Sequence, residues 1–552
     1  MPQIEEKIIS AIKGSLKKIF PGCGGDFSEN IYLEIPKEKR FGDFSTNVAM
    51  RLGRELKRPP EEIALEIVRE VKNSPLCSSG ASPIGDIRVE KPGFINFYLS
   101  NRGVIDALND VIRLGNRFGT SNFGTGKKVQ IEFVSANPTG PLTVAHGRQA
   151  AIGDSLARIL GTCGYSPTRE YYINDEGVQM VLLGKSVKAH FMRMNGLESE
   201  FPENGYKGEY ICDIAREIKE NIKEPGLLMP PDSFFSDYAQ ETIMKAIKKD
   251  LEDFGVKFDV WYSQKELTAS GKILKALDAL EDKGFLYKKD GATWFRSMAF
   301  GDDKDRVVIK SDGSFTYLAP DLAYHREKAG KGYDRIINIW GPDHHGYVNR
   351  IKAAWQAFGF DKEVLSVLIC QLVTLYRDKK PVRMSTRQGE FVTLRQVIDE
   401  VGRDAGRFFF MMRKCDSHLD FDLELAKAKS MDNPVYYIQY AHARIASIIK
   451  FSKRGATAPN LELLDKPEEL EIIKALIQYP KIIESAAKNL EPYLLLAYLQ
   501  DLAGRFHSYY DAYRVVTDDA MLTDARIALI RAMKTVFSNG LNLLGVSALD
   551  EM

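Results

Sequence analysis

Residues 131–160, which read IEFVSANPTGPLTVAHGRQAAIGDSLARIL, constrain the fold more than any other part of the chain. They begin within a strand-like alternation at 129–133, where apolar Val129, Ile131 and Phe133 flank polar Gln130 and Glu132, as in a half-buried strand. Residues 135–147 are rich in Asn, Pro and Gly and predict a tight loop. The following apolar stripe predicts a helix; it comprises Ile152, Leu156, Ile159 and Leu160. A strand, a tight loop and a helix N-terminus in this order bring backbone N–H groups together at an anion site.

His146 and Gly147 stand at the head of this expected helix. An imidazole there can donate a hydrogen bond to a phosphate oxygen and stabilise the charge that develops during nucleotidyl transfer. The alternative is an ordinary strand-to-helix turn with a surface histidine. Position alone leaves both interpretations open.

The segment SANPTGPLTVAHGRQAAIGDSLARIL resembles the signature region of class I aminoacyl-tRNA synthetases, and of bacterial arginyl-tRNA synthetases in particular. The class signature His-x-Gly-His reads Thr143-Val144-Ala145-His146 here, so a hydroxyl replaces the first imidazole. The resemblance implies that Thr143 and His146 are catalytic residues. It also implies an ATP-binding role for Gly140, His146 and Gly147.

The composition of the 552 residues is that of an ordinary globular protein with about two to four domains. The net charge of +1 does not indicate a polyanion partner, so a nucleic-acid surface must arise from local clustering. The six cysteines are scattered and fit reduced thiols, without a zinc or disulfide pattern. The sequence shows neither a signal peptide nor an apolar run of membrane-spanning length. We therefore expect a cytoplasmic protein that does not enter the membrane.

Residues 1–105 predict an α+β N-terminal domain. A helix is expected at 3–20, a strand at 31–35, a helix capped by Ser45 or Thr46, another begun by Pro59-Pro60, and closing strands at 87–100. The cluster Lys37, Lys39, Arg40 and Phe41 fits either a solvated loop or a contact with single-stranded RNA. The family resemblance favours the second alternative, with Arg40 and Phe41 at the elbow of a tRNA.

Residues 106–428 alternate strands and helices, with a Pro-, Gly- and Glu-rich insertion at about 196–235. This alternation predicts a Rossmann-like, doubly wound parallel sheet whose ligands bind at the carboxyl ends of the strands. Tyr317 and Asp321 are spaced to point into one site. Asp343, His344 and His345 follow the apolar strand IINIW. They suit a metal site or an ATP site, and the segment WGPDHHGY resembles the family's ATP-binding segment.

A basic stretch at 377–387 fits either a solvated face or a mobile loop that neutralises a polyphosphate. It reads Arg-Met-Ser-Thr-Arg at 383–387, where the class has Lys-Met-Ser-Lys-Ser. By resemblance, Arg383, Ser385 and Arg387 are catalytic residues and Met384 binds ATP. Both class lysines are replaced, so Lys379, Lys380 or Arg387 supplies the missing charge.

Residues 429–552 predict an all-α helical bundle. Aromatic and basic side chains gather at helical spacing in its first helix, at Tyr436, Tyr440, His442 and Arg444. Such a stripe is either core or a stacking platform for unpaired bases. The segment YYIQYAHAR resembles the family's anticodon-binding domain, which implies that these residues contact tRNA.

The resemblance extends over nearly the whole chain and implies an α/β class I enzyme that activates L-arginine with ATP and transfers it to tRNA(Arg). It also implies that Glu132, Asn137, Tyr317 and Asp321 bind arginine. ATP with Mg²⁺ is expected, without a dedicated protein metal site. We expect a monomer. Two other classes remain open, a related adenylating enzyme such as a cysteinyl or pantothenate-type ligase, and an inactive paralogue that only binds RNA.

Overall fold

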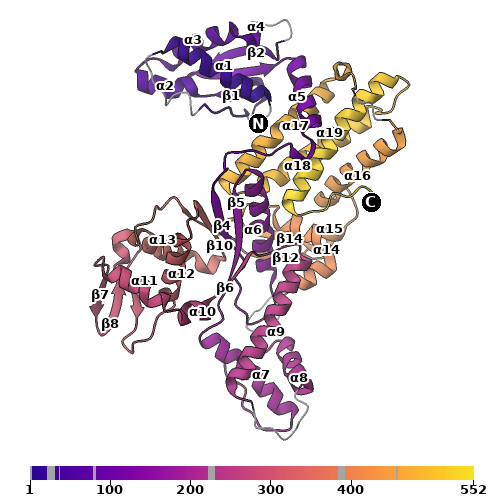
Figure 1. Cartoon of the computed structure of the whole chain (residues 1–552). Coiled ribbons are helices and arrows are strands. Elements are labelled where there is room, and N and C mark those ends of the chain that lie inside the picture. Colours follow the sequence, from indigo (N-terminus) through magenta and orange to yellow (C-terminus); the bar gives the residue numbers. More distant parts are fainter. Residues whose placement is uncertain are drawn as a thin grey trace.

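The computed structural model describes residues 3–21, 31–36, 38–78, 82–221, 230–382, 392–454 and 458–552. At its centre lies a five-stranded parallel sheet with strand order β11-β10-β4-β5-β6 (Figure 1). Its strands are β4 (Lys128–Glu132), β5 (Ser166–Ile173), β6 (Val260–Ser263), β10 (Arg335–Trp340) and β11 (Leu365–Ile369). The alternation of strands and helices therefore predicted the parallel α/β architecture correctly.

Strand β4 is buried on both faces, whereas its alternation predicted a half-buried strand. Gln130 is 0% exposed and Glu132 is 4% exposed. Helix α6 (Val144–Thr162) covers the face of Phe133, because a Cβ at Gly153 would lie 2.3 Å from the Phe133 ring. Helix α12 (Leu318–Gly330) covers the other face. A central strand of a parallel sheet is covered by helices on both sides, so its polar residues lose contact with water. Glu132 has hydrogen-bond partners inside the protein, whereas the Gln130 amide forms no hydrogen bond with the described residues.

Two long segments interrupt the central sheet. A helical arm follows β5 and extends away from the sheet at the bottom of Figure 1; its helices are α7 (Val178–Met194), α8 (Glu209–Asn221) and α9 (Asp232–Asp253). This arm is longer than the predicted insertion at 196–235. The second segment lies between β6 and β10 and has its own hydrophobic core. It contains α10 (Gln264–Ala269), α11 (Lys272–Glu281), the antiparallel strands β7 (Leu286–Lys289), β8 (Ala292–Phe295) and β9 (Arg306–Ile309), and α12.

The N-terminal domain places helices on an antiparallel sheet of order β1-β3-β2. Its elements are α1 (Gln3–Ile19), β1 (Phe44–Thr46), α2 (Val48–Leu56), α3 (Pro60–Lys72), α4 (Pro75–Ser78), β2 (Ile84–Glu90) and β3 (Phe94–Leu99). The strand expected at 31–35 reduces to a single bridge between Glu34 and Ser45. Ser45 and Thr46 belong to β1, and Asn47 takes the N-cap position of α2 that was expected for them.

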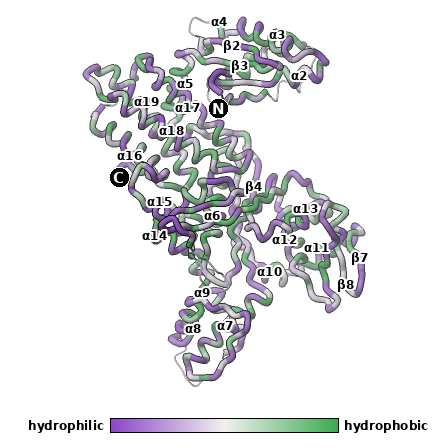
Figure 2. Tube along the Cα trace, turned by 180° about the vertical axis from the view of Figure 1, so that it is seen from behind, coloured by the Kyte–Doolittle hydropathy of each residue, from purple (hydrophilic) through white to green (hydrophobic). Residues whose placement is uncertain are grey.

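The C-terminal residues form a helical bundle, as the sequence predicted. Its helices are α16 (Pro434–Ser452), α17 (Pro467–Asn489), α18 (Tyr493–Ala512) and α19 (Ala520–Leu544). Hydrophobic and hydrophilic residues alternate along these helices, as in helices that pack through one face (Figure 2). Between sheet and bundle lie β12 (Val373–Arg377), β13 (Lys380–Pro381), α14 (Leu394–Phe410), β14 (Leu419–Asp422) and α15 (Leu423–Lys427).

Ion pairs join the N-terminal domain to helix α17 of the bundle. Asp43 pairs with Lys474 at 2.9 Å, and Lys39 pairs with Glu471. The connecting helix α5 (Asn101–Leu114) also packs against α17. The two ends of the chain therefore form one contiguous body beside the catalytic sheet (Figure 1).

Arg407 is a buried junction between the central sheet and the bundle. Its side chain is 0% exposed, and Nη2 donates to Asp154 of α6 at 2.7 Å. Nε donates to the carbonyl of Leu544 at 3.0 Å, and Nη1 donates to the carbonyl of Phe254 at 3.2 Å. Three segments distant in the sequence are thus held by one guanidinium.

We predict that Arg407→Met lowers the free energy of unfolding by about 3–5 kcal/mol, because three buried acceptors lose a charged donor at once. The carbonyls of Leu544 and Phe254 lose the guanidinium, and Asp154 keeps only Arg158 and Arg169 as arginine partners. Arg403→Met is the matched control. Arg403 is 45% exposed and pairs with Asp404, so its loss should cost about 1 kcal/mol or less. Urea unfolding followed by circular dichroism measures both changes, and equal midpoint shifts in the two variants would contradict the junction role of Arg407.

Candidate functional site

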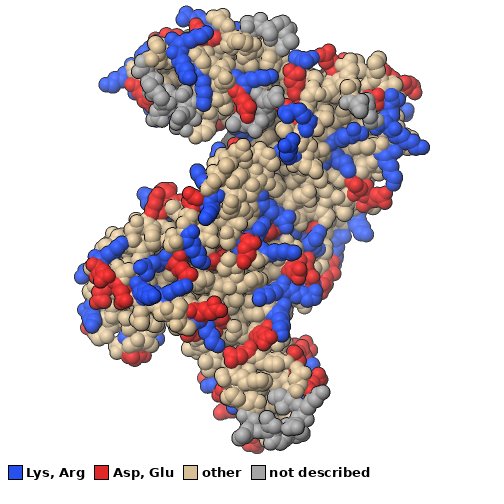
Figure 3. Space-filling view, in the orientation of Figure 1, with Lys and Arg blue, Asp and Glu red and all other residues tan. Residues whose placement is uncertain are grey.

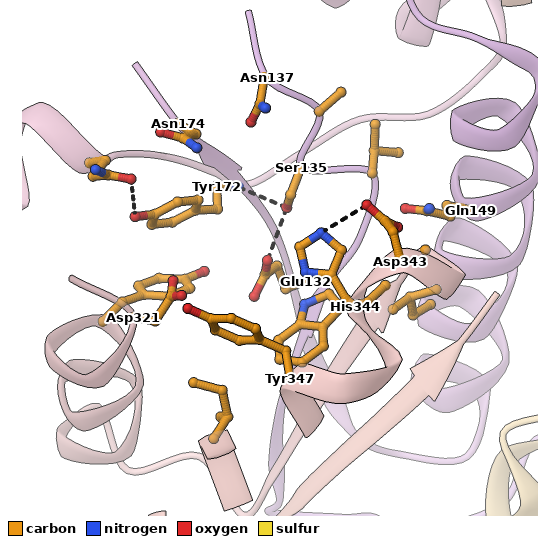
Figure 4. A pocket seen from close by; sticks show the side chains of 18 of the residues that line it. Glu132, Ser135, Asn137, Gln149, Tyr172, Asn174, Asp321, Asp343, His344 and Tyr347 are labelled. Carbon is orange, nitrogen blue, oxygen red and sulfur yellow. Dashed lines mark hydrogen bonds and ion pairs between the residues drawn. The ribbon is translucent and has the colours of Figure 1, made fainter. Parts of the chain in front are cut away.

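A cavity of about 500 Å³ opens at the carboxyl ends of β4 and β10, beside the first turn of α12 (Figure 4). It contains all four residues expected to bind arginine, and also His146, Asp343 and His344 of the expected ATP site. The strand order of the sheet brings together residues that are up to about 200 positions apart in the sequence. This is the edge of a parallel α/β sheet at which ligands bind.

The N-terminus of α6 forms one wall of the cavity, with Thr143 at its cap. The backbone N–H of Thr143 donates to Nδ1 of His146 at 3.0 Å. Because Nδ1 accepts, the ring proton lies on Nε2 and remains available as a donor. Desolvation lowers the pKa of His146 to about 4, so its imidazole is neutral at pH 7. His146 is therefore an uncharged hydrogen-bond donor at a helix N-terminus.

The loop after β4 carries backbone strain. Val134 and Ser135 have φ angles of 68° and 39°, in the left-handed region that residues with a Cβ rarely adopt. Such conformations cost about 1–3 kcal/mol each and persist where surrounding contacts hold them. Here Tyr171 donates to the carbonyl of Ala136 at 2.9 Å, and Asn137 donates to Gln179 at 2.8 Å. The strained turn directs Ser135 and Asn137 toward the cavity (Figure 4).

The Glu132 carboxylate lies at the base of the cavity and already has partners. Lys328 donates to its Oε2 at 2.5 Å, and the hydroxyl of Ser135 donates to its Oε1 at 3.1 Å. The positive charge of Lys328 lowers the pKa of Glu132 despite burial, which acts in the opposite direction. Glu132 is therefore ionised and held in one orientation.

Asp321 faces Glu132 from the first turn of α12. In Figure 4 the Tyr347 hydroxyl points toward its carboxylate. Burial and, secondly, the negative charge of Glu132 raise the pKa of Asp321 to about 7. Within the described ranges, Asp321 forms no ion pair with a lysine, arginine or histidine. The end of the cavity at α12 thus holds one carboxylate with a cation beside it, Glu132, and one without, Asp321.

The remaining expected residues of this site are more exposed. Tyr317 is 73% exposed and lies at the rim. Asp343, His344 and His345 are exposed in the 3-10 helix η4 (Pro342–Tyr347) that follows β10. His344 Nε2 lies 3.6 Å from Asp343 Oδ2. The part of the chain that the structure describes contains no cluster of three metal-ligating side chains.

A second cavity of about 530 Å³ adjoins the first and shares Ala136, Asn137 and His146 with it. Gly140 and Thr143 line it, and residues 203–208 together with the first turn of α8 close it. Tyr210 of that turn donates to the carbonyl of Thr139 at 2.7 Å. Gly147 lies on the far side of α6, against Leu394 and Phe410. Among the described residues that line either cavity, Lys207 is the only lysine or arginine.

The predicted residues of the second signature, Arg383, Met384, Ser385 and Arg387, lie outside the described residues. The structure resumes at Val392, and Thr393 forms an antiparallel bridge with Thr143. Leu394 donates from its N–H to the carbonyl of Leu142 at 2.7 Å. The described backbone at 392–394 therefore lies beside the backbone at 142–143, directly before helix α6.

The predicted tRNA-binding residues differ in their surroundings. Arg40 is exposed over the Phe41 ring, 4.6 Å from its centroid, while Tyr436 and Tyr440 are half-buried and stack 6.0 Å apart. His442 is 3% exposed, and its Nδ1 bonds to the carbonyl of Leu549 at 2.7 Å, so it holds the chain end. Arg444 donates to the Tyr510 hydroxyl at 2.8 Å.

Sequence reasoning missed Lys328, Tyr347 and Ser135 as residues of the site. One signal was present for Lys328. Asp321, Tyr324, His325 and Lys328 follow the spacing of one helical face, at i, i+3, i+4 and i+7. A lysine on the face that bears an expected ligand-binding carboxylate indicates a shared site.

Three family models match consecutive parts of the chain. The family model for class I tRNA synthetases (R), catalytic domain, matches residues 108–416. The arginyl tRNA synthetase N terminal domain matches residues 6–99, and the DALR anticodon binding domain matches residues 438–552. None of the described helices is long and apolar enough to cross a membrane.

Two curated relatives are arginine–tRNA ligases. The one from Syntrophotalea carbinolica is 47% identical over 95% of both chains, and the one from Geobacillus kaustophilus is 45% identical over 100% of this chain and 99% of the other. A putative arginyl-tRNA synthetase structure from Campylobacter jejuni has a TM-score of 0.76 at 33% identity over 82% of this chain and 100% of the other. The Thermus thermophilus arginyl-tRNA synthetase shares the fold, with a TM-score of 0.77 at 21% identity over 99% and 100%. With such identity over nearly the full length of both chains, the protein belongs to the class I arginyl-tRNA synthetases.

Proposed function

We propose that the chain joins L-arginine to ATP as arginyl-adenylate and then transfers the arginyl group to the terminal adenosine of tRNA(Arg). One observation carries the substrate assignment: the cavity beside the α6 N-terminus contains Asp321, a carboxylate that has no cationic partner among the described residues. A guanidinium supplies the missing charge and donates planar, paired hydrogen bonds to a carboxylate.

The arginine side chain would extend toward α12 with its guanidinium at Asp321. The oxygen atoms of Glu132 and of the Tyr347 hydroxyl line the same end of the cavity and can accept further hydrogen bonds (Figure 4). Asn137 lies toward the other end, where an amide can hold the α-amino and carboxylate groups. Tyr317 can cover the guanidinium from the rim. This arrangement directs the substrate carboxylate toward the N-terminus of α6.

ATP would place its phosphates at the N-terminus of α6, where unpaired N–H groups and the helix dipole favour anions. His146 can donate from Nε2 to a phosphate oxygen, and Lys207 can reach the phosphates from the second cavity. Asp343 and His344 line the side of the cavity near β10. Mg²⁺ would arrive with ATP, held mostly by phosphate oxygens and water, and would neutralise part of the pyrophosphate charge.

The reaction needs positioning and charge neutralisation more than proton transfer. The arginine carboxylate attacks the α-phosphorus in line, and pyrophosphate leaves. His146 fits this task because a neutral donor stabilises phosphate charge without accepting a proton from it. A ribose hydroxyl of the tRNA terminus then attacks the activated carbonyl and releases AMP. Roles for Arg383, Ser385 and Arg387 in neutralising pyrophosphate rest on the family resemblance.

The C-terminal bundle would bind the anticodon. Figure 3 shows lysine and arginine side chains gathered over this bundle, where a phosphate backbone can approach. Tyr436 and Tyr440 present stacked rings on α16, and unpaired bases stack on such rings. Arg40 and Phe41 offer a smaller cation and aromatic pair on the N-terminal domain.

The proposal is tested by arginine-dependent exchange of pyrophosphate into ATP, with and without tRNA, followed by aminoacylation of tRNA(Arg). We expect both reactions with arginine and neither with lysine or citrulline, because their head groups leave buried polar groups unpaired. Absence of both reactions with arginine would favour an RNA-binding paralogue. Activity with another acid alone would favour a different adenylating enzyme.

We predict that Asp321→Asn raises the KM for arginine roughly 30- to 1,000-fold, since loss of a charge-assisted contact costs about 2–4 kcal/mol. The substitution is nearly isosteric and leaves no buried lysine without a partner, so folding should be retained. Asp343→Asn makes the same chemical change on the opposite wall and should leave the KM for arginine within about threefold. Similar effects of both variants on arginine would remove Asp321 from the guanidinium site.

Lys207→Met should raise the KM for ATP about tenfold, as expected for the loss of one solvent-accessible cation to phosphate contact. Lys185→Met provides the matched control, because Lys185 is an exposed lysine on α7 that lines neither cavity. Steady-state pyrophosphate exchange at varied ATP measures both variants. An unchanged ATP dependence in Lys207→Met would exclude Lys207 from phosphate binding.

Tyr436→Ala should raise the KM for tRNA(Arg) about 5- to 100-fold while the KM for arginine stays constant, because base stacking contributes about 1–3 kcal/mol per base. Leu274→Ala removes an exposed apolar side chain on α11 and serves as the control. Aminoacylation kinetics at varied tRNA decide the outcome. Equal tRNA dependence in wild type and Tyr436→Ala would leave Tyr436 a structural residue of the bundle.

A further inference from the structure

Three polar residues form a row across the centre of the sheet, beneath α12. Asn338 of β10 lies in register with Glu132 of β4, and Glu132 lies in register with Glu170 of β5. Neighbours in register point to the same face of a sheet, and all three are 4% exposed or less. Two carboxylates are therefore buried side by side under one helix, where an ionised carboxylate requires a partner.

Lys328 of α12 is placed over this row and is completely buried. Its ammonium donates to Glu132 Oε2 at 2.5 Å and to Asn338 Oδ1 at 2.9 Å. It also lies 4.3 Å from the centroid of the Tyr324 ring. An ammonium has three hydrogens, and these three contacts account for them, so Lys328 has no donor left for a ligand.

Further hydrogen bonds fix the orientation of this cluster. The Asn338 amide donates to Nε2 of His325 at 2.9 Å, and the His325 Nδ1–H donates to the carbonyl of Asp321 at 2.8 Å. Burial and the nearby Lys328 charge lower the pKa of His325 to about 4, which keeps this imidazole neutral. A chain of contacts thus runs from Lys328 to the first turn of α12.

The carboxylates around α12 differ in their charge partners. Glu132 has Lys328, and Glu170 has Lys331 at 3.6 Å together with the Tyr324 hydroxyl at 2.6 Å. Asp321 has no cation at ion-pair distance in the described part of the chain. Asp343 also lines the cavity, but its side chain is 79% exposed and solvated. Asp321 is thus the carboxylate at the α12 end of the cavity whose charge is not compensated.

We infer that Lys328 is an internal counter-ion: it compensates Glu132 and leaves the arginine end of the cavity with one net negative charge, matched to a single guanidinium. Lys328 is a positioning residue, because it acts on the substrate only through Glu132 and Asp321. The inference rests on the proposed binding of arginine and extends it to the charge selectivity of the pocket.

This arrangement has a measurable consequence in proton release. The carboxyl group of Asp321 has its pKa raised to about 7 in the free protein, so at pH 6 it is mostly protonated. A guanidinium binds the ionised form, so arginine must displace that proton. The groups that face Asp321, Glu132 and Lys328 from the surrounding elements are His146, Tyr172, Glu170, Tyr324, His325, Lys331, Asp343, His344 and Tyr347. Burial holds the pKa of Tyr172, Tyr324 and Tyr347 above their usual range, so the tyrosines do not titrate near pH 6.

The experiment is calorimetric titration of the full-length protein with L-arginine at pH 6.0, in two buffers of different ionisation enthalpy. A group with a pKa of about 7 is about 0.9 protonated at pH 6, and arginine must displace that proton from Asp321. For the wild type we therefore expect the release of about 0.9 proton per arginine bound. In Lys328→Met, Glu132 loses its counter-ion and takes up a proton in the free protein. Arginine binding then displaces protons from both carboxyls, so the count should rise to about 1.5 or more.

Lys331→Met is the matched control, because it removes the lysine that pairs with Glu170, a carboxylate that does not line the cavity. It should keep the wild-type proton count. Lys328→Arg retains the charge and should restore the wild-type count. A merely structural role for Lys328 would weaken binding without changing the number of protons released.

A proton count in Lys328→Met equal to that of the wild type would overturn the inference while leaving arginine binding intact. Failure of the wild-type protein to bind arginine would instead contradict the proposed function. If Lys328→Met does not fold, the inference is tested with the double variant Glu132→Gln, Lys328→Met, in which both charged side chains are replaced by neutral ones. This double variant should bind arginine with a count of about 0.9 or less, since only Asp321 remains to release a proton. A double variant that folds but releases more than one proton would also overturn the inference.

Discussion

The burial of β4 between α6 and α12 is the constraint on which the catalytic site depends. An alternating strand placed between two helices carries its polar side chains into the interior, and Gln130 and Glu132 are buried there. Desolvation makes an isolated carboxylate costly, so α12 supplies Lys328 at the point where Glu132 meets it. The same placement brings the first turn of α12 opposite the N-terminus of α6. One packing arrangement therefore creates both the pair of carboxylates at which we propose that arginine binds and the helix N-terminus at which we propose that phosphates bind.

The two ends of the cavity differ in charge: a neutral imidazole lies at the end near α6, and carboxyl groups lie at the end near α12. Desolvation keeps His146 neutral, and its Nε2–H is free to donate to the phosphate that we propose for this end. At the other end Glu132 has a counter-ion in Lys328, while Asp321 has no cation at ion-pair distance among the described residues. The strained turn at Val134 and Ser135 lies between these two ends and fixes their separation. Because strain of this kind must be supported by neighbouring contacts, the rigid loop is a property of the site rather than of the strand alone.

Local sequence patterns predicted much of this structure. Periodicity identified β4, α6 and the C-terminal helices, because each repeats an apolar face along its own length. Signature residues identified His146, Glu132 and Asp321 as candidates, and the sheet brings them into one cavity. The pairing of Glu132 with Lys328 spans 196 residues, and no local pattern reports a contact between a strand and a distant helix. The burial of His442 depends likewise on the return of the chain end to α16. The prediction that Ser45 or Thr46 caps a helix was wrong for the opposite reason. Both residues have a good local preference for capping, but the pairing of β1 with β3 places them in a strand.

The ion pairs between the N-terminal domain and α17 have a consequence for shape recognition. Asp43 and Lys39 lie close to Arg40 and Phe41 in the sequence, while α17 belongs to the same bundle as Tyr436 and Tyr440. The two surfaces that we propose to bind RNA are thus both attached to the helical bundle, and the protein sets the distance between them before RNA binds. If both surfaces bind RNA as proposed, this fixed distance selects for RNA shape, because an RNA of the wrong length or bend can contact only one of the two surfaces. Salt screens exposed charges, so a high salt concentration should weaken the ion pairs that fix this distance as well as the proposed binding of RNA.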